Sequence, residues 1–110
     1  MGAFMKGDVV VVNFPFSDLS QAKRRPALVV SRLQGINLIL CQITSQFKQD
    51  EYAIQLFDKD FKNGTLEKPS NVRPNILFTA DSRTVKYKAG QIQRNKLEII
   101  IEKIVEILRK

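Results

Sequence analysis

The feature that most constrains the fold is a single change of period in the apolar residues along the chain. Short apolar runs rich in β-branched and aromatic residues come first, separated by turn residues such as Gln34-Gly35 and Asn63-Gly64. They cover residues 9–14, 27–31, 36–44, 51–57 and 75–80, with a shorter, irregular run at 84–87. Residues 58–71 are predicted to be mostly loop and Lys88-Ala89-Gly90 to be a turn. Several short strands at this spacing favour a small barrel over βαβ units.

The end of the chain has the helical period instead. The spacing predicts one apolar stripe on a helix over residues 96–109, made of Leu97, Ile100, Ile101, Ile104, Val105 and Leu108. Asn95, with Glu98 three residues later, resembles a capping box at its start. We expect the stripe to pack on the barrel. Ile99 and Ile107 fall off this face, so part of the helix is a candidate contact with a second subunit.

The length of 110 residues suits one domain and is too short for two ordinary ones. The prediction is therefore a mainly β small barrel with a C-terminal α-helix over residues 6–110, with residues 1–5 as a leader or alternative start. No apolar run approaches the roughly 18 residues that span a bilayer, and no signal peptide is recognisable. The single cysteine, Cys41, sits in an apolar run and is expected to be a buried, inert thiol. These features indicate a cytoplasmic protein.

The charge balance favours a polyanionic partner. The chain carries 18 basic and 11 acidic residues, a net charge of +7, and neutralising phosphates with such cations releases counterions. The cations concentrate in residues 23–32 and 83–96, two segments without an acid. If the two segments meet in space they form a basic patch. Because there is no histidine and only one cysteine, a zinc site of the usual ligand types is excluded, and we expect no metal and no cofactor.

Two positions stand out as candidates for chemistry on a phosphate. Arg25 precedes Pro26, which biases its backbone to the extended region and aims its guanidinium from the start of a strand. Thr44 and Ser45 end a later strand with adjacent hydroxyls. Both positions also have an ordinary interpretation. Arg25 could be a solvated charge at the end of a strand, and Thr44 and Ser45 could be normal strand residues. Phe16, beside a polar loop, is the best candidate for stacking on a base.

Several segments together resemble the PemK/MazF family of toxins. They are Gly7-Asp8-Val9-Val10, Arg25-Pro26-Ala27-Leu28-Val29-Val30 and Ile43-Thr44-Ser45-Gln46, in this order and spacing, with Ser70-Asn71-Val72-Arg73-Pro74-Asn75-Ile76-Leu77-Phe78-Thr79 and the closing amphipathic helix. The similarity covers residues 6–108. No single motif is very specific, but their ordered set is.

The resemblance implies an SH3-like, CcdB/PemK-type barrel that forms a homodimer. It implies a toxin of a type II toxin–antitoxin system, an mRNA interferase that cuts single-stranded RNA without a metal and is neutralised by a cognate antitoxin. By position, Arg25 and Thr44 would be catalytic. The RNA-binding residues would be Phe16, Ser20, Lys23, Arg24, Ser45, Arg83 and Lys86.

The chemistry that the resemblance implies needs no histidine. The 2′-hydroxyl of the RNA attacks the adjacent phosphate and leaves a 2′,3′-cyclic phosphate and a 5′-hydroxyl, while a guanidinium stabilises the developing charge. Asp81 and Ser45 are candidate helpers in the proton transfer. Two alternatives stay open, namely a CcdB-like toxin that poisons gyrase by protein contact, and a non-catalytic RNA-binding SH3-like module.

Overall fold

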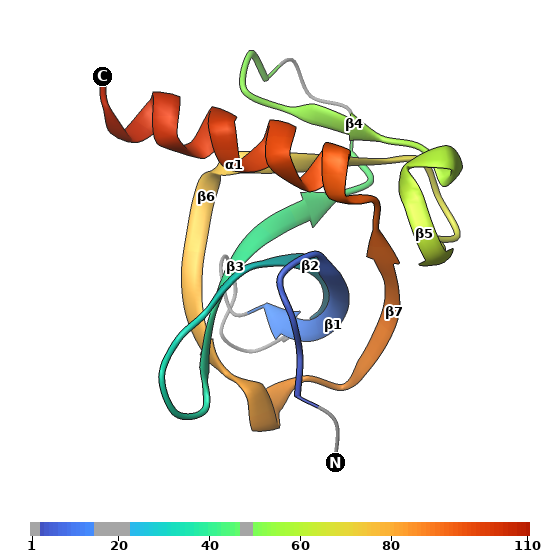
Figure 1. The fold of residues 1–110 in the computed structure, drawn as a ribbon. Helices are drawn as coiled ribbons and strands as arrows, with labels where there is room; N and C mark the ends of the chain where they lie inside the picture. Colours follow the sequence, from blue (N-terminus) through green and yellow to red (C-terminus); the bar gives the residue numbers. More distant parts are fainter. Residues whose placement is uncertain (1–2, 15–22, 47–49) are drawn as a thin grey trace.

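The computed structural model describes residues 3–14, 23–46 and 50–110. Their strands form one antiparallel sheet in the order β4-β6-β3-β2-β1-β7-β5, which bends round into a half-barrel with the helix α1 across one side (Figure 1). The elements are β1 Asp8–Phe14, β2 Lys23–Arg32, β3 Asn37–Thr44, β4 Ile54–Leu56, β5 Phe61–Gly64, β6 Ser70–Asp81, β7 Tyr87–Ile92 and α1 Arg94–Leu108, with 3-10 turns at Asp58–Asp60 and Ser82–Thr84. The predicted mainly β barrel with a closing helix is confirmed.

Apolar side chains pack on both faces of the sheet, because the strands carry apolar residues at odd and even positions alike. One core cluster includes Val9, Leu28, Cys41, Ile43 and Val72 and receives the helix through Ile100 and Ile104. The other lies on the opposite face and is formed by Val10, Val12, Ala27, Val29, Leu38 and Leu40, with Phe4 and Phe78 packed against it. Residues 27–30 of β2 therefore alternate between the two core clusters.

Two local predictions were wrong, for the same reason. The predicted loop over 58–71 contains β5 and the start of β6, and the predicted turn at 88–90 lies inside β7. Gly90 serves close packing rather than a turn, since a Cβ there would lie 2.5 Å from the carbonyl oxygen of Asn63 on β5. Gly64, opposite Gly90, has a φ of 68° and ends β5. Glycine marks a close approach of two backbones here, which sequence alone reads as a turn.

The helix differs from the prediction at both ends. It starts at Arg94 after the N-cap Gln93, and Asn95 lies in its first turn, so the predicted capping box is wrong. Ile100 and Ile104 are buried, and Leu97 and Ile101 pack on the core as predicted. Val105 and Leu108 are exposed instead, because the last turns of α1 project beyond the edge of β6 (Figure 1). Among the described residues, no helix is long and apolar enough to cross a bilayer.

A buried carboxylate fixes the start of the sheet. Asp8 is 1% exposed and accepts hydrogen bonds from the backbone N–H of Met5 over 2.9 Å and from Nε2 of Gln91 over 3.2 Å. It also pairs with Nζ of Lys88 at 3.2 Å. Gly7, with a φ of 93°, makes the turn that brings Met5 back to Asp8. The motif Gly7-Asp8 thus joins β1 to β7 and sets the position of Lys88.

Candidate functional site

The first residues of β2 distribute three cations over the two faces of the sheet. Arg25 lies opposite Val12 and Arg24 opposite Asn13 of β1. Since successive side chains of a strand point to opposite faces, Arg25 shares the face of Val12 and Ala27. Arg24 shares the other face with Pro26, which lies opposite Val11. Neighbours in sequence therefore leave the strand on opposite faces.

The strand pairing brings Thr44 to the same face as Arg25. Ala27 of β2 lies opposite Gln42 of β3, the last pair of this ladder. Because side chains alternate along a strand, Arg25 and Thr44, each two residues further on, share the face of Ala27 and Gln42. On the other side of β3, Gln42 lies opposite Arg73 and Thr44 opposite Asn71 of β6. Arg25, Thr44 and Arg73 thus belong to three adjacent strands and one face of the sheet.

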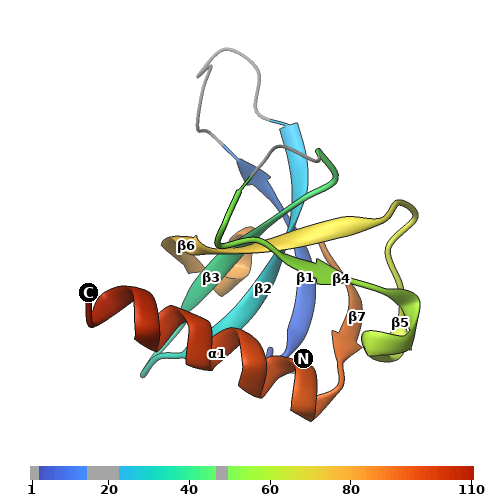
Figure 2. The same cartoon turned by 90° about the horizontal axis from the view of Figure 1, so that it is seen from above.

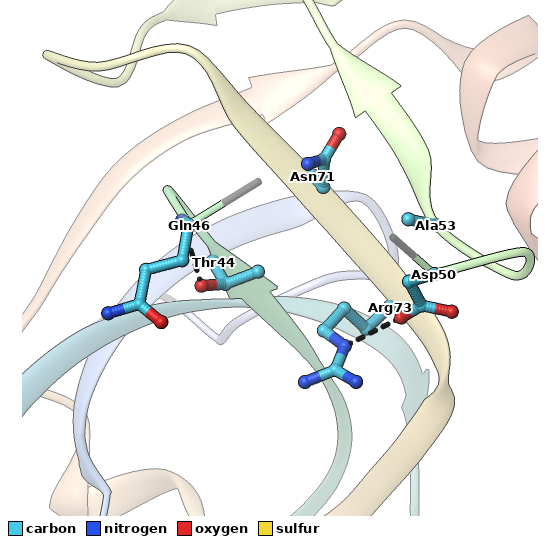
Figure 3. A pocket seen from close by; sticks show the side chains of 6 residues that line it. All are labelled: Thr44, Gln46, Asp50, Ala53, Asn71 and Arg73. Carbon is cyan, nitrogen blue, oxygen red and sulfur yellow. Dashed lines mark hydrogen bonds and ion pairs between the residues drawn. The ribbon is translucent and has the colours of Figure 1, made fainter. Parts of the chain in front are cut away.

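Thr44 opens into a small polar pocket of about 50 Å³. It is lined by Thr44, Gln46, Asp50, Ala53, Asn71 and Arg73, all shown in Figure 3. Oγ1 of Thr44 accepts the backbone N–H of Gln46 over 3.1 Å, a bond that does not use the hydroxyl hydrogen of Thr44. Arg25 is not among the residues that line this pocket. The pocket offers hydrogen-bond donors for a small anionic group.

Arg73 is the cation of this pocket, and sequence reasoning missed it. Its Nε donates to Oδ2 of Asp50 over 2.9 Å and its Nη1 to Oε1 of Gln42 over 3.3 Å, while Figure 3 shows the terminal nitrogens pointing away from Asp50. A guanidinium has five N–H donors, so both on Nη2 remain beyond these two bonds. The only signal was the pair Arg73-Pro74, which also fits the ordinary start of a strand.

The side chain of Asp50 contacts Arg73 in its ionised, carboxylate form. The backbone N–H of Tyr52 donates to its Oδ1 over 2.9 Å, and this bond, with the bond and charge of Arg73, lowers the pKa of Asp50 below its ordinary value against the opposing effect of burial. A carboxyl group with a lowered pKa is a weak base. Asp50 therefore orients Arg73 and does not suit the role of general base.

A second and larger concavity, which we call the β2–β7 groove, lies on the other side of the β2 start. It has a volume of about 620 Å³. Its walls are the start of β2 with Val11, the segment 65–70 with Ser45, and residues 87–89 of β7. Lys23, Arg24, Arg25, Lys68 and Lys88 border it. The two basic segments meet here, since Lys88 belongs to residues 83–96.

The remaining candidates lie elsewhere or outside the described residues. Arg83 donates to both carboxylate oxygens of Asp81 and lines a separate pocket with Arg32. Lys86 is exposed and donates its backbone N–H to Val11 over 2.8 Å. Phe16 and Ser20 fall in the range 15–22, outside the described residues. The structure therefore joins Lys23, Arg24 and Ser45 in one groove but not Arg83 or Lys86.

Asp81 is excluded as a helper of Thr44 within one subunit. Asp81 lies opposite Asn37, at the first residue of β3, while Thr44 is its last. Seven steps of about 3.3 Å put their backbones about 23 Å apart. The ion pair with Arg83 lowers the pKa of Asp81 as well. In the described part of the chain, no group of His, Cys, Asp and Glu side chains could hold a metal ion.

The chain as a whole is similar to known proteins. Residues 5–108 match the family model described as "PemK-like, MazF-like toxin of type II toxin-antitoxin system". A comparison with curated protein sequences gave no match.

Solved structures show the same fold. An endoribonuclease in complex with its cognate antitoxin from a mycobacterial species has a TM-score of 0.76 at 13% identity, over 96% of this chain and 95% of that one. MazF from Deinococcus radiodurans has a TM-score of 0.72 at 23% identity, over 96% of each chain. The Mycobacterium tuberculosis toxin MazF-mt6 has a TM-score of 0.72 at 15% identity, over 93% and 96%.

Proposed function

Because the chain belongs to the PemK-like, MazF-like toxins of type II toxin–antitoxin systems, we propose that its Thr44 pocket cleaves single-stranded RNA at short sequences. The observation that carries the proposal is the placement of Arg25, Thr44 and Arg73 on adjacent strands and one face of the sheet. The strand that carries Thr44 thus runs between two strands that each bring an arginine to this face, which suits the binding of a phosphodiester. The toxin domain runs over residues 6–110.

The reaction uses the nucleophile of the substrate. The 2′-hydroxyl oxygen loses its proton and forms a bond to the adjacent phosphorus, while the bond from phosphorus to the 5′-oxygen breaks and this oxygen takes up a proton. The products are a 2′,3′-cyclic phosphate and a 5′-hydroxyl. Arg25 stabilises the charge that develops on the phosphoryl oxygens. Thr44 donates its hydroxyl to one of these oxygens, and Arg73 holds the phosphate from the β6 side. No metal takes part in these steps.

The proposed cognate partner is an acidic antitoxin segment. The support is the concentration of cations around the β2–β7 groove and the family to which the chain belongs. Since such binding is largely electrostatic, its affinity should fall as salt rises. An affinity that does not change between low and high salt would contradict this part of the proposal.

The proposed unit is a cytoplasmic homodimer. Its support is the apolar surface of α1 that the sheet leaves uncovered, where Ile99, Val105 and Leu108 are exposed. Light scattering at micromolar concentration measures the mass of the particle in solution. A mass equal to one chain would refute the homodimer.

The experiment that tests the nuclease is the cleavage of a long single-stranded RNA in EDTA, with the product ends mapped. The wild type should cut at a recurring short sequence and leave cyclic phosphate ends. Arg25→Ala and Thr44→Val should lose the cuts while keeping the wild-type circular dichroism. Lys103→Gln on α1 is the matched control and should cut normally. A folded wild type that leaves the RNA intact would refute the proposal.

A further inference from the structure

The turn that precedes β4 connects the proposed cleavage site to the far end of α1. It spans residues 50–53, and the backbone N–H of Ala53 closes it by donating to the carbonyl oxygen of Asp50 over 3.1 Å. The helix α1 runs beside β4 and β6 in both views (Figure 1 and Figure 2). Resting on the proposed nuclease function, we propose that Tyr52 is a positioning residue of the site. Its ring, held beside the end of α1, fixes the turn from which Asp50 orients Arg73.

The turn uses both carboxylate oxygens of Asp50. An aspartate at the first position of a turn commonly accepts the backbone N–H two residues later, and here the N–H of Tyr52 donates to Oδ1 over 2.9 Å. The other oxygen, Oδ2, accepts Nε of Arg73 over 2.9 Å (Figure 3). The direction of the carboxylate, and with it the direction of the guanidinium, therefore depends on the backbone of Tyr52.

The side chain of Tyr52 is held by a lysine that follows α1. Nζ of Lys110 lies 4.9 Å from the centre of the ring and donates to the phenol oxygen over 3.3 Å, and this bond raises the pKa of Lys110 above its ordinary value. Nζ of Lys103 lies 6.0 Å from the ring centre, at the outer limit of an attraction between a cation and a ring. Since Lys103 also pairs with Glu106 at 3.7 Å, Lys110 is the main partner of the ring.

Tyr52 acts on the site without touching it. Its neighbours Asp50 and Ala53 line the Thr44 pocket, but Tyr52 itself does not. Removing the half-buried ring would keep the backbone N–H of residue 52 and would remove the contact that ties the turn to the end of α1. We expect the carboxylate and the guanidinium of Arg73 then to sample more directions. Small misplacements of a group that orients a substrate lower the rate strongly.

The first test observes Arg73 directly and needs no RNA. Heteronuclear NMR follows the exchange of its Nε–H with water, and the signal is assigned by its loss in Arg73→Lys. Exchange should be slow in the wild type and in Tyr52→Phe, which keeps the ring. In Tyr52→Ala it should be about tenfold faster, because the bond to Asp50 opens more often. Lys110→Gln should accelerate it by about two- to fivefold, the contribution of one exposed contact between a cation and a ring.

The second test measures cleavage rates in a double-mutant cycle. Tyr52→Ala should lower kcat/KM about tenfold in the wild-type background. In the Asp50→Asn background it should lower kcat/KM by less than about twofold, because the ring acts only through that carboxylate. A contribution of Tyr52 to overall stability alone would lower the rate equally in both backgrounds.

A matched aromatic control exists elsewhere in the chain. Lys59 and Lys96 lie 5.6 and 5.9 Å from the ring centre of Phe57, and the backbone N–H of Phe57 donates to a carboxylate oxygen of Asp60. Phe57 does not line the cleavage pocket. Phe57→Ala should therefore leave both the exchange and the cleavage rates unchanged, and so should Lys103→Gln. Thermal melting of each variant shows whether it is folded.

The outcomes separate this inference from the nuclease proposal. Faster exchange of Arg73 in Tyr52→Ala, with no cleavage by the wild type, would refute the nuclease and support the connection from Tyr52 to Arg73. Exchange as slow in folded Tyr52→Ala as in the wild type overturns the connection, and so does a loss of rate that persists in Asp50→Asn. If Tyr52→Ala does not fold, exchange in Lys110→Gln decides, and a rate equal to that of the wild type overturns the inference.

Discussion

Nε of Arg73 donates to Oδ2 of Asp50 over 2.9 Å, and this contact fixes the guanidinium beside Thr44. It connects β6 to the segment that leads into β4, two parts of the chain 23 residues apart. Asp50 has a second partner in the backbone N–H of Tyr52. The geometry of the pocket therefore depends on a carboxylate that no sequence motif marks.

Replacing Arg73 should reduce cleavage strongly. Arg73→Ala should lower kcat/KM by about 100-fold, the usual effect of losing one donor to the developing charge. Arg73→Lys should recover only part of it, since an ammonium group cannot contact Asp50 and Gln42 and still present a planar fork. Initial rates on a mapped RNA substrate measure this. A value for Arg73→Ala within threefold of the wild type would show that Arg73 only supports the fold.

Asp50 should make stability depend on pH in acid. Its pKa is lowered from the ordinary 3.8 in the folded state, so the carboxylate stabilises the fold above the unfolded value and this contribution disappears as the pH falls through the folded value. In urea titrations, the difference in unfolding free energy between wild type and Asp50→Asn should be constant above about pH 5 and shrink below about pH 4. A difference that stays constant down to about pH 3 would contradict the assignment.

Removing the buried carboxylate of Asp8 should destabilise the protein. Asp8→Ala leaves Lys88 and the N–H groups of Met5 and Gln91 without their acceptor, which should cost about 3 kcal/mol of unfolding free energy. Asp8→Asn keeps an acceptor oxygen and should cost less. Urea denaturation at neutral pH compares the two, and equal stabilities of Asp8→Ala and wild type would refute the role of this contact.

Cys41 should be unreactive in the folded protein. Its thiol is buried and donates to the carbonyl oxygen of Arg73 over 3.0 Å, and burial raises the pKa of Cys41 to about 12. Thiolate is the reacting form, so iodoacetamide at about pH 8 should modify the thiol only after unfolding in guanidinium chloride. Mass spectrometry of the native and of the unfolded protein measures how much of the thiol is modified. Rapid modification of the native protein would contradict the burial of Cys41.

Much of the fold followed from local patterns. The runs at 9–14, 27–31 and 75–80 lie within strands, and the run at 36–44 does so from Asn37 onward. The predicted helical stripe is buried at Ile100 and Ile104. Errors arose where a residue has two uses. Gly90 has the sequence context of a turn but makes a close contact between β7 and β5. Leu108 continues the apolar stripe of the helix but is exposed.

The sequence by itself determined which segments are strands, where the helix lies and that cations gather at the start of β2, because these depend on the period and kind of neighbouring residues. The tertiary structure alone decided which distant residues meet. It placed Ser45 and Thr44 in two different pockets, and it brought Arg73, Asp50 and Gln42 together. The physical reason is register. A strand alternates its side chains at every residue, so pairing across strands, which local sequence does not encode, sets the face and the neighbours of each one.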